Sequence, residues 1–198
     1  MLSGSLNIFG FTFTNDYYGR LDEICDRIVG PQLWFPRGRL GDYPDIGDWS
    51  QKTWSELRGG TKRAIIALEQ VGRGGRVMGV IIYQQHKTLP NCLELKHLSV
   101  DGEKAGRQIG SFLLRQAEVE GTREFPRVEK IVGDVKMKRA DVINFMLANR
   151  YRIAQARVDL YGLVKGNGGN LDVVFEKEVT RVSRRSETER RIILAGNG

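Results

Sequence analysis

The chain has 198 residues, of which 40% are hydrophobic and 28% are charged, and its formal net charge is +7 at pH 7. These values exclude a wholly disordered chain, and the sequence has no run of about 20 apolar residues that would form a membrane helix. The positive charge favours anionic partners such as a phosphorylated cofactor. Nucleic acid is a secondary expectation, because no recognition motif accompanies the charge.

The first 62 residues are predicted to form a strand, a helix, a long loop and a second helix. Residues 5–13 alternate loosely in polarity, and an apolar helical face follows Asp16 as far as a Gly-Pro pair. Residues 31–48, rich in glycine and proline, predict the loop. Trp54 and Leu57 predict a short second helix, and the loop region carries the aromatic residues Trp34, Phe35, Tyr43 and Trp49. These aromatic residues either wall a substrate pocket or cover the core.

From residue 63 the pattern changes to strands. RAIIALEQ (63–70) and VMGVIIYQQ (77–85) flank a glycine-rich turn and predict a hairpin, and CLELKHLSV (92–100) predicts a third strand. Apolar residues then recur at helical spacing from Ile109 to about Glu120. Further on, we predict a strand in VEKIVGDV (128–135), a helix in RADVINFMLANR (139–150), and strands in YRIAQARVDLY (151–161) and LDVVFEKEV (171–179).

This order of elements predicts an α+β fold in which helices flank a mixed sheet on both sides. We expect one domain over residues 1–179 and a basic extension over residues 180–198. Cys25 and Cys92 lack metal-ligand spacing, so we expect a reduced, cytoplasmic chain without a metal site. The extension contains Ile192, Ile193 and Leu194, which favour contact with another surface and leave a homodimer open.

The stretch VDGEKAGRQIGSFLL (100–114) leads from a strand through a glycine-containing loop into a helix. The N-terminus of a helix offers unpaired N–H groups and partial positive charge, and a glycine lets an anion approach them closely. Lys104 and Arg107 add mobile positive charge. The stretch therefore predicts a phosphate site, although Gly110 can equally serve close helix packing.

Residues 63–179 resemble the GNAT superfamily of N-acetyltransferases, through LSVDGEKAGRQIGSFLL (98–114) and VINFMLANRY (142–151). The pyrophosphate loop of that family, R/Q-x-x-G-x-G/A, falls on residues 105–110, with Ala105 in place of Arg or Gln and Gln108 in place of the middle glycine. In the second motif, Arg150 stands where the family has glycine and Met146 where it has tyrosine. Residues 1–62 fit the variable helical start of the family more loosely.

The resemblance implies transfer of an acetyl group from acetyl-CoA to an amine. It also implies that the strand before the pyrophosphate loop parts from its neighbour and that the pantetheine arm lies between them. The cofactor-binding residues that it implies are Leu98, Ser99, Val100, Ala105, Gly106, Arg107, Gln108, Ile109, Gly110 and Ser111.

By the same resemblance, a strand glutamate that serves as the base in histone-type members falls on Glu94. Partial burial is expected to raise the pKa of Glu94 towards the working pH, although the residue can also lie on a solvated sheet face with Lys96. Strand alternation places His97 on the opposite face. Methionine cannot donate a proton, so Met146 cannot protonate the leaving thiolate, and Tyr151 and Tyr161 are the candidate substitutes.

Two functions remain open from the sequence. The first is an acetyl-CoA-dependent N-acetyltransferase acting on an amine of unknown identity. The second is a weakly active or inactive binding module of the same fold, which docks a protein or RNA partner through the aromatic loop and the arginine-rich extension. The departures at Ala105, Gln108 and Met146 favour the second.

Overall fold

A computed structural model describes residues 6–8, 10–24, 28, 46–70, 75–104, 106–137, 139–158 and 171–179. The elements in chain order are β1 (Leu6–Ile8), β2 (Phe11–Thr14), the 3₁₀ turn η1 (Tyr18–Arg20), α1 (Leu21–Glu23), α3 (Ile46–Arg58), β3 (Arg63–Glu69), β4 (Arg76–Gln85), β5 (Cys92–Val100), the 3₁₀ turn η4 (Gly102–Lys104), α4 (Ile109–Glu124), β6 (Lys130–Lys136), α5 (Ala140–Ala148), β7 (Arg152–Val158) and β8 (Leu171–Glu178).

The strands form one sheet in the order β1-β2-β3-β4-β5-β6-β8-β7. Every neighbouring pair is antiparallel except β5 and β6, which run parallel. A parallel pair needs a crossover connection, and α4 supplies it between these two strands. The sheet is therefore mixed and mostly antiparallel, as the sequence predicts.

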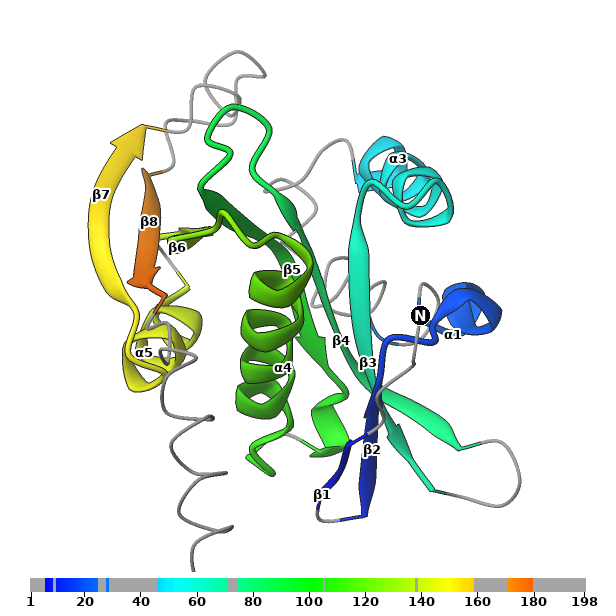
Figure 1. Ribbon diagram of the computed structural model, residues 1–198. Coiled ribbons are helices and arrows are strands. Elements are labelled where there is room, and N and C mark those ends of the chain that lie inside the picture. Colours follow the sequence, from blue (N-terminus) through cyan, green and yellow to red (C-terminus); the bar gives the residue numbers. More distant parts are fainter. Residues whose placement is uncertain are drawn as a thin grey trace, which may run out of the picture.

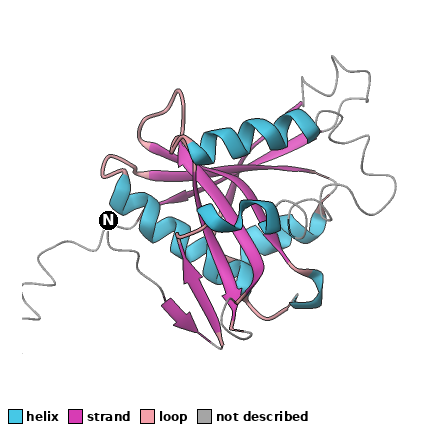
Figure 2. Ribbon diagram, turned by 90° about the vertical axis from the view of Figure 1, so that its right-hand side faces the viewer, coloured by secondary structure: helices cyan, strands magenta, loops and turns pink. Residues whose placement is uncertain are grey.

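Helices cover both faces of the sheet (Figures 1 and 2). On one face, apolar side chains of α4 and α5 pack on alternate residues of β3, β4 and β5. On the other face, α1 and α3 pack on the remaining alternate residues, such as Ile66, Val80 and Ile82. β4 thus buries both of its faces, which explains its nearly continuous apolar run.

The predicted elements from residue 63 onward are confirmed, and α4 extends to Glu124 rather than ending near Glu120. Two predictions in the first 62 residues are wrong. Residues 5–13 do not form one strand, because Gly10 adopts a φ of +82° and the chain turns back from β1 into β2. The second helix begins at Ile46, so it includes the last residues of the predicted loop.

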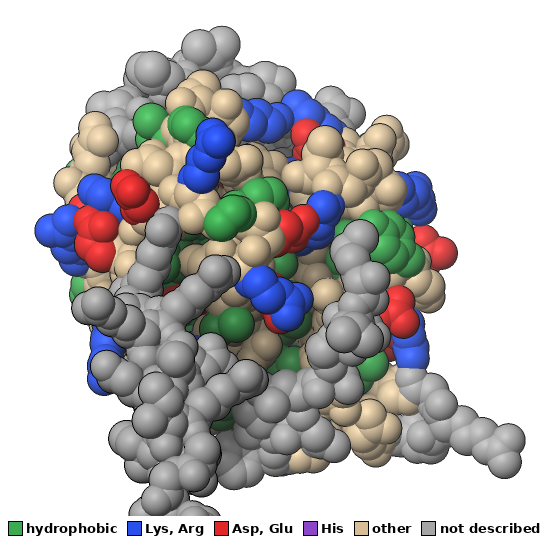
Figure 3. Space-filling model, viewed as in Figure 1, with side chains coloured by type: hydrophobic (Ala, Val, Ile, Leu, Met, Phe, Trp, Pro, Cys, Tyr) green, Lys and Arg blue, Asp and Glu red, His purple; other side chains and the backbone are tan. Residues whose placement is uncertain are grey.

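Other predictions lie outside the described residues: the loop and its aromatic residues from 29 to 45, Ala105, Tyr161 and the extension over 180–198. None of the described helices is both long and apolar enough to span a membrane. On the face shown in Figure 3, basic and acidic side chains are interspersed over the coloured surface.

Candidate functional site

The first feature of the site is the point where β5 leaves β6. The parallel ladder joins Cys92 to Lys130 and ends at Leu95 and Gly133, whereas β5 continues to Val100. Beyond this point β6 remains paired with β8, and β5 remains paired with β4. The expected parting of the strand before the loop from its neighbour is therefore present.

A β-bulge lies at this point of parting. Tyr83 of β4 is opposite Leu95, and the next residue, Ile82, is opposite His97, so Lys96 is an extra residue in β5. A bulge of this kind shifts the alternation of side chains by one residue. Glu94 and His97 consequently lie on the same face, the one that α1 and α3 cover, and the prediction that they lie on opposite faces is wrong.

Glu94 is held by two hydrogen bonds. Nε2 of Gln84 donates to Oε2 over 2.6 Å, and Nζ of Lys96 donates to Oε1 over 2.8 Å. Burial raises the pKa of the Glu94 carboxyl, but the hydrogen bonds and charge of Lys96, together with Gln84, outweigh burial and lower the pKa below its ordinary value. The expectation of a raised pKa is wrong, and Glu94 is a stable carboxylate on this face.

His97 forms a second polar contact on the same face. Its Nε2 lies 2.6 Å from Oγ of Ser99, which is itself buried. Burial lowers the pKa of His97 to about 4, because the interior disfavours the charged imidazolium. At neutral pH, His97 is therefore uncharged and bonded to Ser99.

The predicted cofactor residues surround the end of β5 and the start of α4. Leu98 and Val100 pack on the α4 side of the sheet, whereas Ser99 lies on the α1 side. In the described part of the chain, the backbone N–H groups of residues 108–111 donate to no protein acceptor. No side-chain cap satisfies them either, so this helix end presents a cluster of anion-binding donors.

Gln108 and Arg150 stand where the family resemblance expects glycine, and both keep the backbone that glycine favours. Their φ angles are +60° and +68°, and no other non-glycine residue of the described chain has a positive φ. Such a conformation is unfavourable for a residue with a Cβ. These two positions therefore adopt a left-handed backbone without a glycine.

The charged side chains near this helix end differ from the prediction. Nζ of Lys104 bonds Oε1 of Glu69 over 2.7 Å, so Lys104 is held to β3 and is not mobile. Arg107 is exposed and remains a candidate. A Cβ on Gly110 would lie 3.3 Å from the ring of Phe145, so this glycine also permits close packing between α4 and α5.

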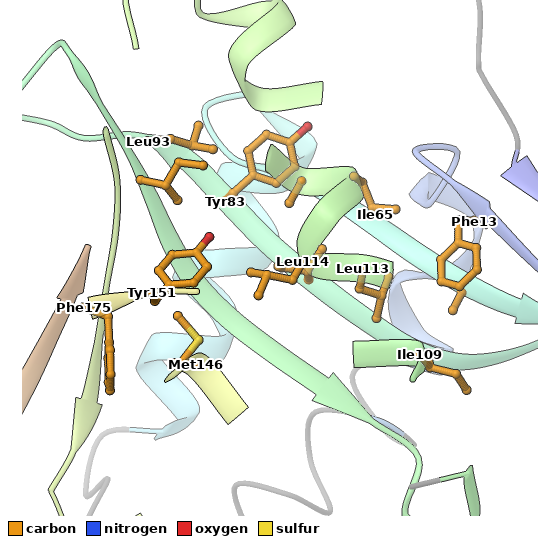
Figure 4. Packing of buried hydrophobic residues seen from close by; sticks show 14 of the residues in the cluster. Phe13, Ile65, Tyr83, Leu93, Ile109, Leu113, Leu114, Met146, Tyr151 and Phe175 are labelled. Atoms are coloured by element: carbon orange, nitrogen blue, oxygen red, sulfur yellow. The ribbon is translucent and has the colours of Figure 1, made fainter. Parts of the chain in front are cut away.

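Of the two candidate proton donors for a leaving thiolate, Tyr151 lies in the core and Tyr161 lies outside the described residues. Met146 is buried, and Figure 4 shows it beside Tyr151 and Phe175. The Tyr151 hydroxyl donates to Oε1 of Glu118 over 2.9 Å, and Nζ of Lys177 also bonds this carboxylate. Burial, with the neighbouring Glu118, raises the pKa of Tyr151. Tyr151 is thus part of a network that joins α4 to β8.

Sequence reasoning missed the bulge and the Gln84 contact, because both depend on which residue of β4 lies opposite. No three His, Cys, Asp or Glu side chains within the described ranges are grouped to hold a metal ion. The candidate site therefore has two parts, separated by the stretch of β5 that is not in the ladder to β6. Main-chain N–H donors at the start of α4 follow this stretch, and the hydrogen-bonded carboxylate of Glu94 precedes it.

No protein-family model and no curated protein sequence matches the chain. Its structure does match solved acetyltransferases. An N-acetyltransferase from Staphylococcus aureus Mu50 is 14% identical, with a TM-score of 0.63 over 86% of this chain and 99% of that chain. A protein from Desulfovibrio desulfuricans described as a GNAT-family acetyltransferase is 14% identical, with a TM-score of 0.58 over 69% and 83%.

A third match is a Bacillus anthracis protein described as a streptothricin acetyltransferase, solved in complex with acetyl coenzyme A. It is 13% identical, with a TM-score of 0.52 over 60% of this chain and 63% of that chain, so the match spans less than two thirds of its length. Together these likenesses show that the chain has the GNAT acetyltransferase fold.

Proposed function

We propose that this chain is an N-acetyltransferase that uses acetyl-CoA as co-substrate and an amine as acceptor. The observation that carries the proposal is the N-terminus of α4, where the N–H groups of residues 108–111 have no acceptor within the described chain. Donors of this kind suit a diphosphate. A protein of the same fold was solved with acetyl coenzyme A, which contains one.

The position of β5 supports the same proposal. Its last five residues, Lys96–Val100, lie between the helix end and Glu94 and continue past the ladder to β6. An extended pantetheine arm along this part of the strand would be bound by Leu98, Ser99 and Val100. The acyl group would then lie towards the bulge, close to the face that carries Glu94.

The chemistry is attack of a neutral amine on a thioester carbonyl, in which a C–N bond forms, the C–S bond breaks and the amine loses a proton. Glu94 is ionised, so it attracts the ammonium form of the acceptor and stabilises the positive charge that develops on nitrogen. Its lowered pKa makes it a weak base, and we infer that the proton passes through it to water. Water also protonates the thiolate, because Met146 cannot.

The N–H donors are tested by a single proline. Ser111 is the third residue of α4, where proline is tolerated, so Ser111→Pro removes one N–H and leaves the helix intact. We expect acetyl-CoA affinity to fall about 10- to 100-fold, the value of one charge-assisted hydrogen bond. Ser111→Ala keeps the N–H and should bind as the wild type does. Equal affinity of the two variants in calorimetric titration would remove the donors from the site.

A thermal-shift titration tests the proposal as a whole. A ligand at about 100 times its dissociation constant stabilises the folded chain by about 2.7 kcal/mol, so acetyl-CoA and free CoA should both raise the melting temperature. If millimolar acetyl-CoA gives no shift, the alternative of a GNAT-fold binding module is favoured.

If binding is observed, Glu94→Gln should lower kcat by about 10²-fold in an amine panel and leave that shift unchanged.

A further inference from the structure

The ammonium group of Lys96 already contacts the carboxylate of Glu94, which is proposed to attract the amine acceptor. Its Nζ lies 2.8 Å from Oε1 of Glu94, and the side chains of the two residues are only 27% and 16% exposed. The bulge causes this geometry, because the extra residue lies where β5 leaves β6. Lys96 therefore has the chemistry and the position of a bound amine acceptor.

We propose that Lys96 is a self-acetylation site, modified by the acetyl-CoA bound to the same chain. The proposal rests on the proposed function and adds an acceptor within the protein. A tethered amine beside the thioester reacts at a high effective concentration, so the reaction needs no further substrate.

The step balances without another reactant. Neutral Nζ of Lys96 attacks the thioester carbonyl, the N–C bond forms and the C–S bond breaks, leaving an amide and the CoA thiolate. The proton that Nζ loses passes by way of the Glu94 carboxylate to water, and water protonates the thiolate. The products are acetyl-Lys96 and free CoA.

The modification changes the electrostatics of the site. An acetylated Lys96 carries no positive charge, and Glu94 then retains the hydrogen bond from Gln84 but loses an ion pair. Because Lys96 is a main cause that lowers the pKa of Glu94, its acetylation raises that pKa. A more basic carboxylate is a better proton acceptor for an incoming amine, so self-acetylation prepares the site for transfer to an external acceptor.

Other lysines provide internal controls. Lys87 is 66% exposed, so unassisted chemical acetylation favours it over Lys96. Lys104 is about as shielded as Lys96 and bonds Glu69 over 2.7 Å, but it lies at the other end of β5. Acetylation that depends on exposure to solvent should therefore label Lys87 faster than Lys96. Acetylation by acetyl-CoA bound at the site should label Lys96 faster than Lys87.

The test is quantitative mass spectrometry of tryptic and chymotryptic peptides after incubation of the full chain with acetyl-CoA. A parallel sample receives S-acetyl-N-acetylcysteamine, a thioester without the nucleotide. We expect acetyl-CoA to label Lys96 at least about tenfold faster than Lys87 and Lys104, and the small thioester to favour Lys87. Desulfo-CoA should suppress the labelling of Lys96 alone.

Two other outcomes overturn the proposal in different ways. If acetyl-CoA raises the melting temperature but Lys96 is labelled no faster than Lys87, self-acetylation is refuted and the proposed function stands. If acetyl-CoA produces neither a thermal shift nor labelling of Lys96, both proposals fail. The variant Lys96→Arg, which keeps the positive charge, should lose the labelled peptide and retain the thermal shift with acetyl-CoA. Labelling of a neighbouring lysine in this variant would contradict the assignment of the modification to Lys96.

Discussion

The two halves of β5 have different surroundings. Residues Cys92–Leu95 are hydrogen-bonded to β4 on one side and β6 on the other, whereas the ladder to β6 does not include Lys96–Val100. The first half holds Glu94 with a fixed hydrogen-bond partner, and the second half leads to the N-terminus of α4, whose first N–H groups have no acceptor among the described residues. β5 thus has one part that is paired with strands on both sides and one part that is paired only with β4 among the described strands, and a single bulged residue separates the two parts.

Deletion of Lys96 is expected to have the largest effect on the difference between the two halves of β5. Deletion removes the bulge and leaves the residues on either side opposite the same partners in β4. We expect the chain to fold and its acetyl-CoA affinity to fall at least about tenfold, because a regular β5 can continue alongside β6. Lys96→Ala keeps the bulge and is the control. Calorimetric titration would contradict the role of the bulge if the deletion variant bound as well as Lys96→Ala.

Truncating one leucine in each half compares their rigidity. Leu93 is fully buried and packs against Gly121 of α4, so Leu93→Ala should lower the free energy of unfolding by about 2–5 kcal/mol. Leu98 is only partly buried, and Leu98→Ala should cost about 1–2 kcal/mol. Urea denaturation measures both. Equal losses would show that the second half is packed as firmly as the first.

The partly buried imidazole of His97 in the second half makes stability depend on pH. The pKa of His97 is lowered to about 4 in the folded chain from an ordinary 6.5, so the unfolded chain binds more protons between these values. The contribution of His97 to the free energy of unfolding is therefore fully present above about pH 6.5 and is lost as the pH falls towards 4. The total loss is about 3 kcal/mol. His97→Gln should flatten this part of the profile in urea denaturation; an unchanged slope would contradict the assignment.

The smallest expected effect concerns the two left-handed residues. Gln108→Gly and Arg150→Gly each relieve an unfavourable φ, and each should raise the free energy of unfolding by up to about 1 kcal/mol. Asn149→Gly is a comparison at a negative φ of −90°, and it should be destabilising both for this reason and because it loses the hydrogen bond from Nδ2 to the Phe145 carbonyl oxygen. Thermal denaturation of the three variants compares them. A loss of stability in Gln108→Gly would show that its side chain makes a compensating contact.

Much of the fold could be predicted from local patterns. The strands and helices from residue 63 onward follow apolar periodicity, and the predicted strand, loop and helix at residues 100–114 are present. The break between β1 and β2 was missed because it depends on the backbone of Gly10 within a loosely alternating stretch. The environment of Glu94 was missed because the pKa of a carboxyl depends on its partners as much as on its burial.

By itself, the sequence determined the elements, their order and the resemblance to a family, since these depend on residues close together in the chain. Only the tertiary structure decided that β5 bulges at Lys96, that Glu94 and His97 share a face, and that Lys104 bonds to Glu69. The physical reason is that register and side-chain pairing are set across strands: whether CLELKHLSV alternates evenly depends on how β4 pairs with it, and on where β6 ceases to do so.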